Sequence, residues 1–68
     1  MTTPPVTERQ LQIIRLLASG YGYKQIADLL GISPATVRNH LHVAYESLGA
    51  NHSAHAVALA WDWLNLSQ

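Results

Sequence analysis

The sequence predicts an all-α fold, a four-helix bundle built around a central helix-turn-helix. Apolar residues recur at helical spacing in four segments, and side chains that cap helices precede the first and the third of them. Only three residues, one of them Gly, separate the second segment from the third. A link this short between two helices is typical of the helix-turn-helix, and a plain helical hairpin is the alternative interpretation.

The first helix is expected over residues 8–19, and residues 1–6 are expected to form a flexible leader. Pro4 and Pro5 prevent a helix there and favour an extended backbone. Thr7 and Gln10 have the spacing of a capping box, in which each side chain accepts a hydrogen bond from the other residue's amide. The apolar face of this helix comprises Leu11, Ile14, Leu17 and Ala18. The domain is expected to span residues 7–66.

The second and third helices are expected over residues 23–30 and 34–48. Gly31 ends the second helix, Ser33 is a good N-cap for the third, and Pro34 suits the first helical position. The residues predicted to face the core recur at helical spacing, and they are Ile26, Ala27, Leu30, Val37, Leu41, Ala44 and Leu48.

The face of the third helix opposite its apolar stripe is the candidate DNA-binding surface. Its side chains are small, basic or able to form hydrogen bonds, and such groups read base edges and contact phosphates. Lys24, in the first turn of the second helix, also points outward. The predicted DNA-binding residues are Lys24, Ser33, Ala35, Thr36, Arg38, Asn39, His40 and His42.

The fourth helix, expected over residues 53–66, is apolar on nearly all sides. One stripe is expected to complete the core, and it comprises Val57, Ala60, Trp61 and Leu64. A second stripe is expected to form the interface of a homodimer, and it comprises Ala56, Leu59, Trp63 and Leu66. The alternative is that Trp63 only folds over the exposed end of the chain.

Composition limits the possible functions. The 68 residues allow one small domain, the formal net charge is zero, and charged residues make up only 12%. No metal or cofactor is expected, because cysteine is absent and the paired histidines do not converge as zinc ligands do. An enzyme is not expected, because no nucleophile is paired with a base. No apolar run is long enough for a membrane span or a signal peptide, so a cytoplasmic protein is expected.

Several short motifs carry a family resemblance: Ile26-Ala27, Leu30, Ile32-Ser33, Thr36-Val37-Arg38, His40, Leu48-Gly49 and Ala56-Val57. With them, residues 7–60 resemble the C-terminal DNA-binding domain of LuxR/FixJ-type regulators, and in length the chain is most similar to the free-standing GerE type. The resemblance implies a four-helix domain without a wing, whose third helix enters the major groove and whose fourth mediates dimerisation. It also implies DNA contacts by Lys24, Thr36, Arg38 and Asn39.

The chain departs from this family mainly where the family is usually basic. Glu46 and Ser47 occupy commonly basic positions, and His52-Ser53 replaces the Asn-Arg pair that usually opens the fourth helix. Three other positions also differ from the family's usual residues. This chain has Gln10 where the family usually has Glu, Gly22-Tyr23 where it has Ser-Asn, and Leu64 where it has the Gly that ends the fourth helix. Two phosphate contacts are therefore expected to be lost, while base reading is retained.

The predicted function is a small transcription regulator that binds double-stranded DNA as a homodimer, with residues 34–48 in the major groove. The alternative is an interaction module that docks on another regulator or on RNA polymerase through the fourth helix. The second and third helices also resemble those of sigma-factor region four, which supports this alternative.

The four histidines lead to a separate expectation. An imidazole ordinarily titrates at about pH 6.5, so mild acid is expected to add positive charge at the DNA-facing side and to strengthen DNA binding. The alternative is that one or more of these rings belongs to a buried core histidine that is hydrogen-bonded and stays neutral. In that case acid destabilises the fold instead.

Overall fold

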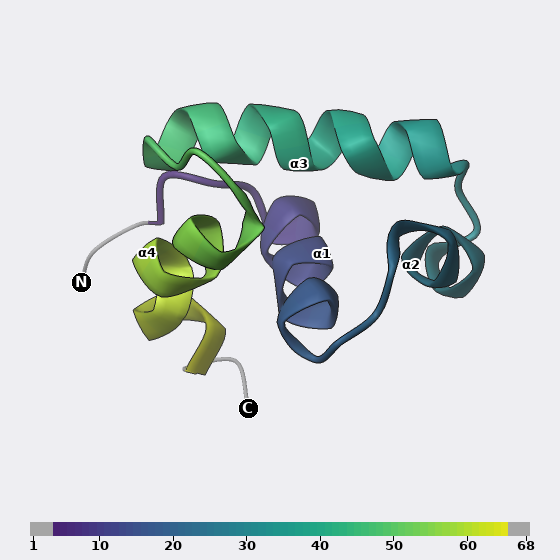
Figure 1. Ribbon diagram of the computed structural model, residues 1–68, viewed down its shortest axis with the longest axis horizontal. Helices are drawn as coiled ribbons and strands as arrows, with labels where there is room; N and C mark the ends of the chain where they lie inside the picture. The colour runs from purple at the N-terminus through teal and green to yellow at the C-terminus, as the bar shows by residue number, and fades with distance from the viewer. Residues whose placement is uncertain (1–3, 66–68) are drawn as a thin grey trace.

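The computed structural model describes residues 4–65, and these residues form four α-helices. α1 spans Glu8–Ala18, α2 Tyr23–Leu30, α3 Pro34–Leu48 and α4 Ser53–Asn65. Residues 4–65 contain no strand, and the predicted all-α fold is confirmed. Figure 1 shows α3 along one side of the molecule, with α4, α1 and α2 arranged beneath it in that order. α1 lies between α4 and α2 (Figure 1), and α1 and α3 each contact all three other helices.

The predicted helix boundaries agree closely with the structure. The second and third helices have the predicted bounds, whereas α1 ends at Ala18, one residue before its predicted end. Ser19 is the C-cap, and its amide donates to the carbonyl oxygens of Arg15 and Leu16, both at 3.1 Å. Leu66, the predicted end of the fourth helix, lies outside the described residues.

The predicted caps form as hydrogen bonds. Thr7 Oγ1 accepts from the Gln10 amide at 3.1 Å, and the Thr7 amide donates to Gln10 Oε1 at 2.8 Å, which completes the capping box. Gly31 ends α2 with a φ of 70°, a left-handed conformation that Gly adopts without steric cost. Ser33 Oγ accepts from the Thr36 amide at 3.1 Å and caps the start of α3. These local interactions set the short link between α2 and α3.

The core lies where α1 meets the other helices. Its largest fully buried side chains are those of Ile13, Ile14, Ile26, Leu41 and Val37. The predicted apolar face of α1 is wrong at two positions, because Ile13 is buried and Ala18 is exposed. A helix with neighbours on several sides buries more than a single stripe, whereas its last residue borders the solvent-exposed turn. The central position of α1 therefore widens its buried surface.

Val6 belongs to the core, although the sequence places it in a flexible leader. Its side chain is 8% exposed and lies in the same buried cluster as Leu11. Val6 directly precedes the N-cap Thr7, and Leu11 is the fourth residue of the helix. Apolar residues at these two positions form a hydrophobic staple, which fixes how the chain enters a helix. The ordered fold therefore begins before Thr7.

α4 buries most of the stripe predicted to face the core, because Ala60 and Leu64 are buried and Val57 packs against the core. The prediction is wrong for Trp61, which is exposed, and for Ala56, which is buried although it was assigned to the interface stripe. Ala56 and Ala60 are 0% exposed and Leu64 is 4% exposed, whereas Trp61 is 52% exposed. Trp63 is partly buried and packs against the core. The buried positions recur every four residues, and Trp61 lies about 100° around the helix from Ala60. The two tryptophans therefore have the opposite environments from those predicted.

Candidate nucleic-acid interface

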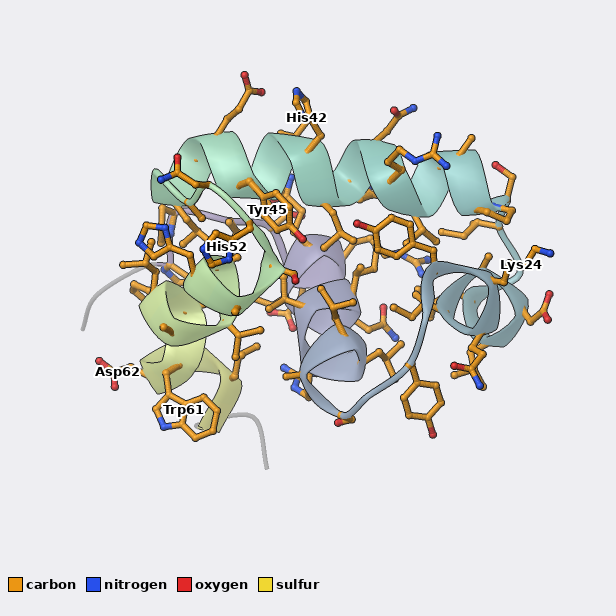
Figure 2. All side chains as sticks on the ribbon, in the orientation of Figure 1. Lys24, His42, Tyr45, His52, Trp61 and Asp62 are labelled. Carbon is orange, nitrogen blue, oxygen red and sulfur yellow. The ribbon has the colours of Figure 1, made fainter. Side chains whose placement is uncertain are left out.

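The outer face of α3 points away from the other helices. Figure 2 shows His42 on this face, on the side of α3 opposite α1. The exposed members of the predicted DNA-binding set are Lys24, Ser33, Ala35, Arg38, Asn39 and His42. Thr36 and His40 are half-buried. The fold thus brings most of the predicted residues to one accessible side of the helix-turn-helix.

Ser33 and Thr36 form a hydroxyl pair at the start of α3. Ser33 Oγ and Thr36 Oγ1 are 2.9 Å apart, and Ser33 Oγ also accepts from the Thr36 amide. The bond between the two hydroxyl groups uses one hydroxyl hydrogen, so the other remains to donate to an outside acceptor. The pair also lies beside the Ala35 amide, which has no partner within the helix, whereas Pro34 has no N–H and the Thr36 amide already donates to Ser33 Oγ. The start of α3 can therefore offer one hydroxyl group and the Ala35 amide to a phosphate group.

Tyr45 packs α3 against its neighbours. Its hydroxyl oxygen is buried near Tyr23 of α2 and Ser53 of α4, without a hydrogen bond of good geometry. Burial, and then the neighbouring Tyr23 hydroxyl, raises the pKa of Tyr45 to about 12. The phenol therefore stays neutral at physiological pH, and Tyr45 acts as a packing group behind the outer face of α3.

Only two of the four basic side chains lie on the helix-turn-helix. Lys24 is exposed on α2, and Figure 2 places it at the end of the molecule where α3 begins. Arg38 is exposed on α3. The other two, Arg9 and Arg15, lie on α1, where they line a hollow of about 430 Å³. The positive charge beside the outer face of α3 is therefore small.

Two exposed residues extend the outer face of α3 beyond the predicted set. Val43 is 49% exposed, and Glu46 is exposed as well. They follow Asn39 by four and seven residues, which places all three on the same side of the helix. Helical spacing alone places both residues on this face. They were not among the predicted DNA-binding residues because that set contained only small, basic or uncharged hydrogen-bonding side chains. Glu46 adds a negative charge to a surface that otherwise suits DNA.

The histidines fall into two structural groups. His42 is exposed and His40 is half-buried, both on α3. His52 Nδ1 accepts from the His55 amide, and His55 Nδ1 accepts from the Asn51 amide, each at 3.2 Å. Both rings therefore accept a hydrogen bond, but His52 is exposed and His55 is half-buried, so neither is the buried core histidine of the alternative interpretation. Across residues 4–65, no three His, Cys, Asp or Glu side chains are grouped as metal ligands.

Two helices joined by a three-residue turn, the second with an exposed polar face, define a helix-turn-helix DNA-binding domain. The comparison with known families gives the same class. Residues 4–60 match the family described as bacterial regulatory proteins, luxR family. The match covers most of the chain, and the protein belongs to this family, so the resemblance found in the sequence is confirmed. None of the described helices has the length and apolar character needed to cross a bilayer.

Proposed function

We propose that this protein regulates transcription by binding double-stranded DNA as a homodimer, with α3 of each chain in the major groove. The outer face of α3 is the observation that carries the proposal. Arg38 and Asn39 are exposed within the first two turns after the N-cap Ser33, where recognition helices contact base edges. An Arg side chain pairs with guanine through two hydrogen bonds, and an Asn side chain pairs with adenine in the same way. Base reading therefore rests on these two residues.

The small number of basic side chains near α3 predicts a shallow salt dependence. If each chain neutralises about two to four phosphates, the slope of log affinity against log salt concentration for a dimer is roughly −4 to −7. Fluorescence anisotropy with one labelled duplex, between about 50 and 200 mM salt, measures this slope. A slope steeper than about −10 would contradict the assignment. The variant Arg9→Gln, on α1, is the matched control and is expected to leave the slope unchanged.

We place the proposed dimer interface on the outward side of α4. Leu59 is 42% exposed and Trp61 is 52% exposed, and they flank an exposed strip of α4 that holds Ala54, Ala58 and Asp62. Small side chains allow two helices to approach closely, and a large exposed aromatic ring gains the most from being covered. Figure 2 shows Trp61 pointing away from the body of the molecule. The surface is therefore suited to a second copy of α4.

This surface differs in part from the stripe predicted from the sequence. Ala56 is 0% exposed, so its side chain cannot contact a second copy. Trp63 packs against the core and has only part of its ring available. Leu66 lies outside the described residues. Of the predicted stripe, Leu59 is the residue that the proposed interface retains.

Replacement of Trp61 is expected to produce a folded monomer. Trp61→Ala removes exposed apolar area from the proposed interface but no core contact, so helicity is retained while dimer affinity falls by about 1–3 kcal/mol. Sedimentation velocity over a range of protein concentrations, with circular dichroism, measures both properties. Gln12→Ala, an exposed change on α1, is the control and is expected to keep the wild-type association. A wild-type chain that remains monomeric at millimolar concentration would refute the dimer.

The same exposed surface supports a second candidate function. The formal net charge of zero gives little general attraction to DNA, and Leu59 and Trp61 suit an apolar protein partner equally well. On this alternative, α4 docks on another regulator or on RNA polymerase. A mobility-shift assay at two salt concentrations, with a size measurement of the free protein, separates the two. Monomers that fail to shift DNA even at low salt favour the docking function.

A further inference from the structure

The start of α4 is held by two imidazole rings. His52 directly precedes the first residue of α4, and its Nδ1 atom accepts from the His55 amide at 3.2 Å, as an N-cap side chain does. His55 Nδ1 accepts from the Asn51 amide, also at 3.2 Å. The ring centroids are 5.7 Å apart. His52 therefore has the role of the N-cap Ser or Thr in a capping box, whereas His55, at the third helical position, accepts from the amide one residue before the N-cap rather than from the N-cap amide itself.

These hydrogen bonds require both rings to be neutral. A neutral imidazole has one nitrogen that accepts and one that donates, so acceptance at Nδ1 leaves the hydrogen on Nε2. A protonated ring donates from both nitrogens and cannot accept in any orientation. Protonation also places a positive charge at a helix N-terminus, where the helix dipole opposes it. Protonation of either ring therefore breaks a hydrogen bond at the start of α4.

We propose that His52 and His55 form an acid-sensitive cap, which holds the start of α4 at neutral pH and releases it when the rings are protonated. The unfolded chain takes up the same protons without losing a hydrogen bond. By linkage, protons that the unfolded chain binds and the capped fold does not bind make the fold less stable as the pH falls. The cap thus couples solution acidity to the helix that carries Leu59 and Trp61.

Protonation of this cap depends on the charged and titratable groups of the helices that pack around α4. From α3, the group near Ser53 is Tyr45, whose raised pKa of about 12 keeps it neutral in this range. The other titratable or charged side chains on the packed helices are Glu8, Arg9 and Arg15 on α1, Arg38, His40, His42 and Glu46 on α3, and Asp62 on α4. Within the described part of the chain, no carboxylate forms an ion pair with His52 or His55. Figure 2 shows Asp62 at the opposite end of α4 from His52.

The chain contains a specific reporter for this helix. Its two tryptophans, Trp61 and Trp63, both lie on α4. Tryptophan emission therefore reports on α4, whereas far-ultraviolet circular dichroism reports on all four helices. Release of the cap is expected to shift the emission of the partly buried Trp63 toward longer wavelength before most helicity is lost.

Thermal melts of the free protein at about pH 7.5 and pH 5.5 test the proposal, with the double variant His52→Asn/His55→Gln as the key comparison. Asn is a good N-cap and Gln can accept at the third position, so the variant keeps a cap that does not titrate. The wild-type melting temperature is expected to fall by about 4–8 °C on acidification, the equivalent of one lost cap. The melting temperature of the double variant is expected to fall by less than half as much as that of the wild type.

His42→Asn is the matched control, because His42 is exposed on α3 and caps nothing. It is expected to keep the full wild-type shift. A wild-type melting temperature that is unchanged by acid, or a double variant with the full wild-type shift, would overturn the proposal. If the double variant fails to fold, His52→Asn alone decides by the same criterion. These measurements contain no DNA, so they succeed or fail independently of the proposed regulatory function.

Discussion

Trp63→Ala is expected to lower the free energy of unfolding by about 2–4 kcal/mol, whereas Trp61→Ala is expected to change it by less than about 1 kcal/mol. The two residues have the same side chain and are two positions apart on α4. Trp63 is partly buried and packs against the core, while Trp61 is 52% exposed. Removal of a packed indole leaves a cavity beside the core, but removal of an exposed one leaves only a smaller surface.

Urea unfolding followed by circular dichroism measures this difference. Both variants are compared with the wild type at one low protein concentration, at which each is monomeric, so that dimer dissociation does not contribute. A 68-residue domain has little stability to lose, so Trp63→Ala is expected to be partly unfolded at 37 °C. Equal destabilisation by both variants, or a larger effect of Trp61→Ala, would contradict the packing of α4 described above.

Arg38→Ala is expected to weaken binding to the preferred DNA site by about 1–3 kcal/mol and to relax selectivity for its base sequence. Arg38 is exposed on α3 one turn after the N-cap, where a guanidinium group can reach a guanine edge. Loss of a base contact lowers affinity for the preferred site more than affinity for random DNA. The ratio of the two affinities is therefore the quantity to measure.

Lys24→Ala is the matched variant for this experiment. Lys24 is also a single exposed cation, but it lies on α2, where it is suited to a phosphate rather than a base. It is expected to weaken binding to all sequences alike and to make the salt slope of a dimer shallower by about two, one phosphate for each chain. If Arg38→Ala leaves the ratio of specific to random affinity unchanged, Arg38 does not read a base.

Local signals in the sequence were sufficient to predict most of the fold. The Thr7 and Ser33 caps and the Gly31 turn depend on neighbouring residues only, and all three form as expected. Helical spacing likewise predicted the buried stripe of α3, because one side of that helix is polar and the other apolar. Its outer face follows from the same contrast, although Val43 and Glu46 extend it.

Tertiary packing decided the features that the sequence left ambiguous. α4 is apolar on most sides, so its periodicity does not distinguish the face that packs on α1 from the face left exposed. The small side chains of Ala56 and Ala60 allow α4 to pack closely on α1 with these two residues facing the core. With this face buried, Trp61 points outward. Val6 is buried because it directly precedes a capped helix and packs in the same cluster as Leu11. Val6 was expected to lie in a flexible leader because Pro4 and Pro5 precede it. The roles of His52 and His55 required the atomic positions of their Nδ1 atoms.

Selection of duplexes from a random-sequence pool is the most direct test of the claim that α3 reads DNA. The wild-type protein and Arg38→Ala are each carried through the same rounds at one low salt concentration. We expect the wild type to enrich a two-fold site with half-sites about 10 base pairs apart, and Arg38→Ala to enrich it only weakly. Retention of DNA by the wild type with no enriched sequence, or equal enrichment by both proteins, would contradict it.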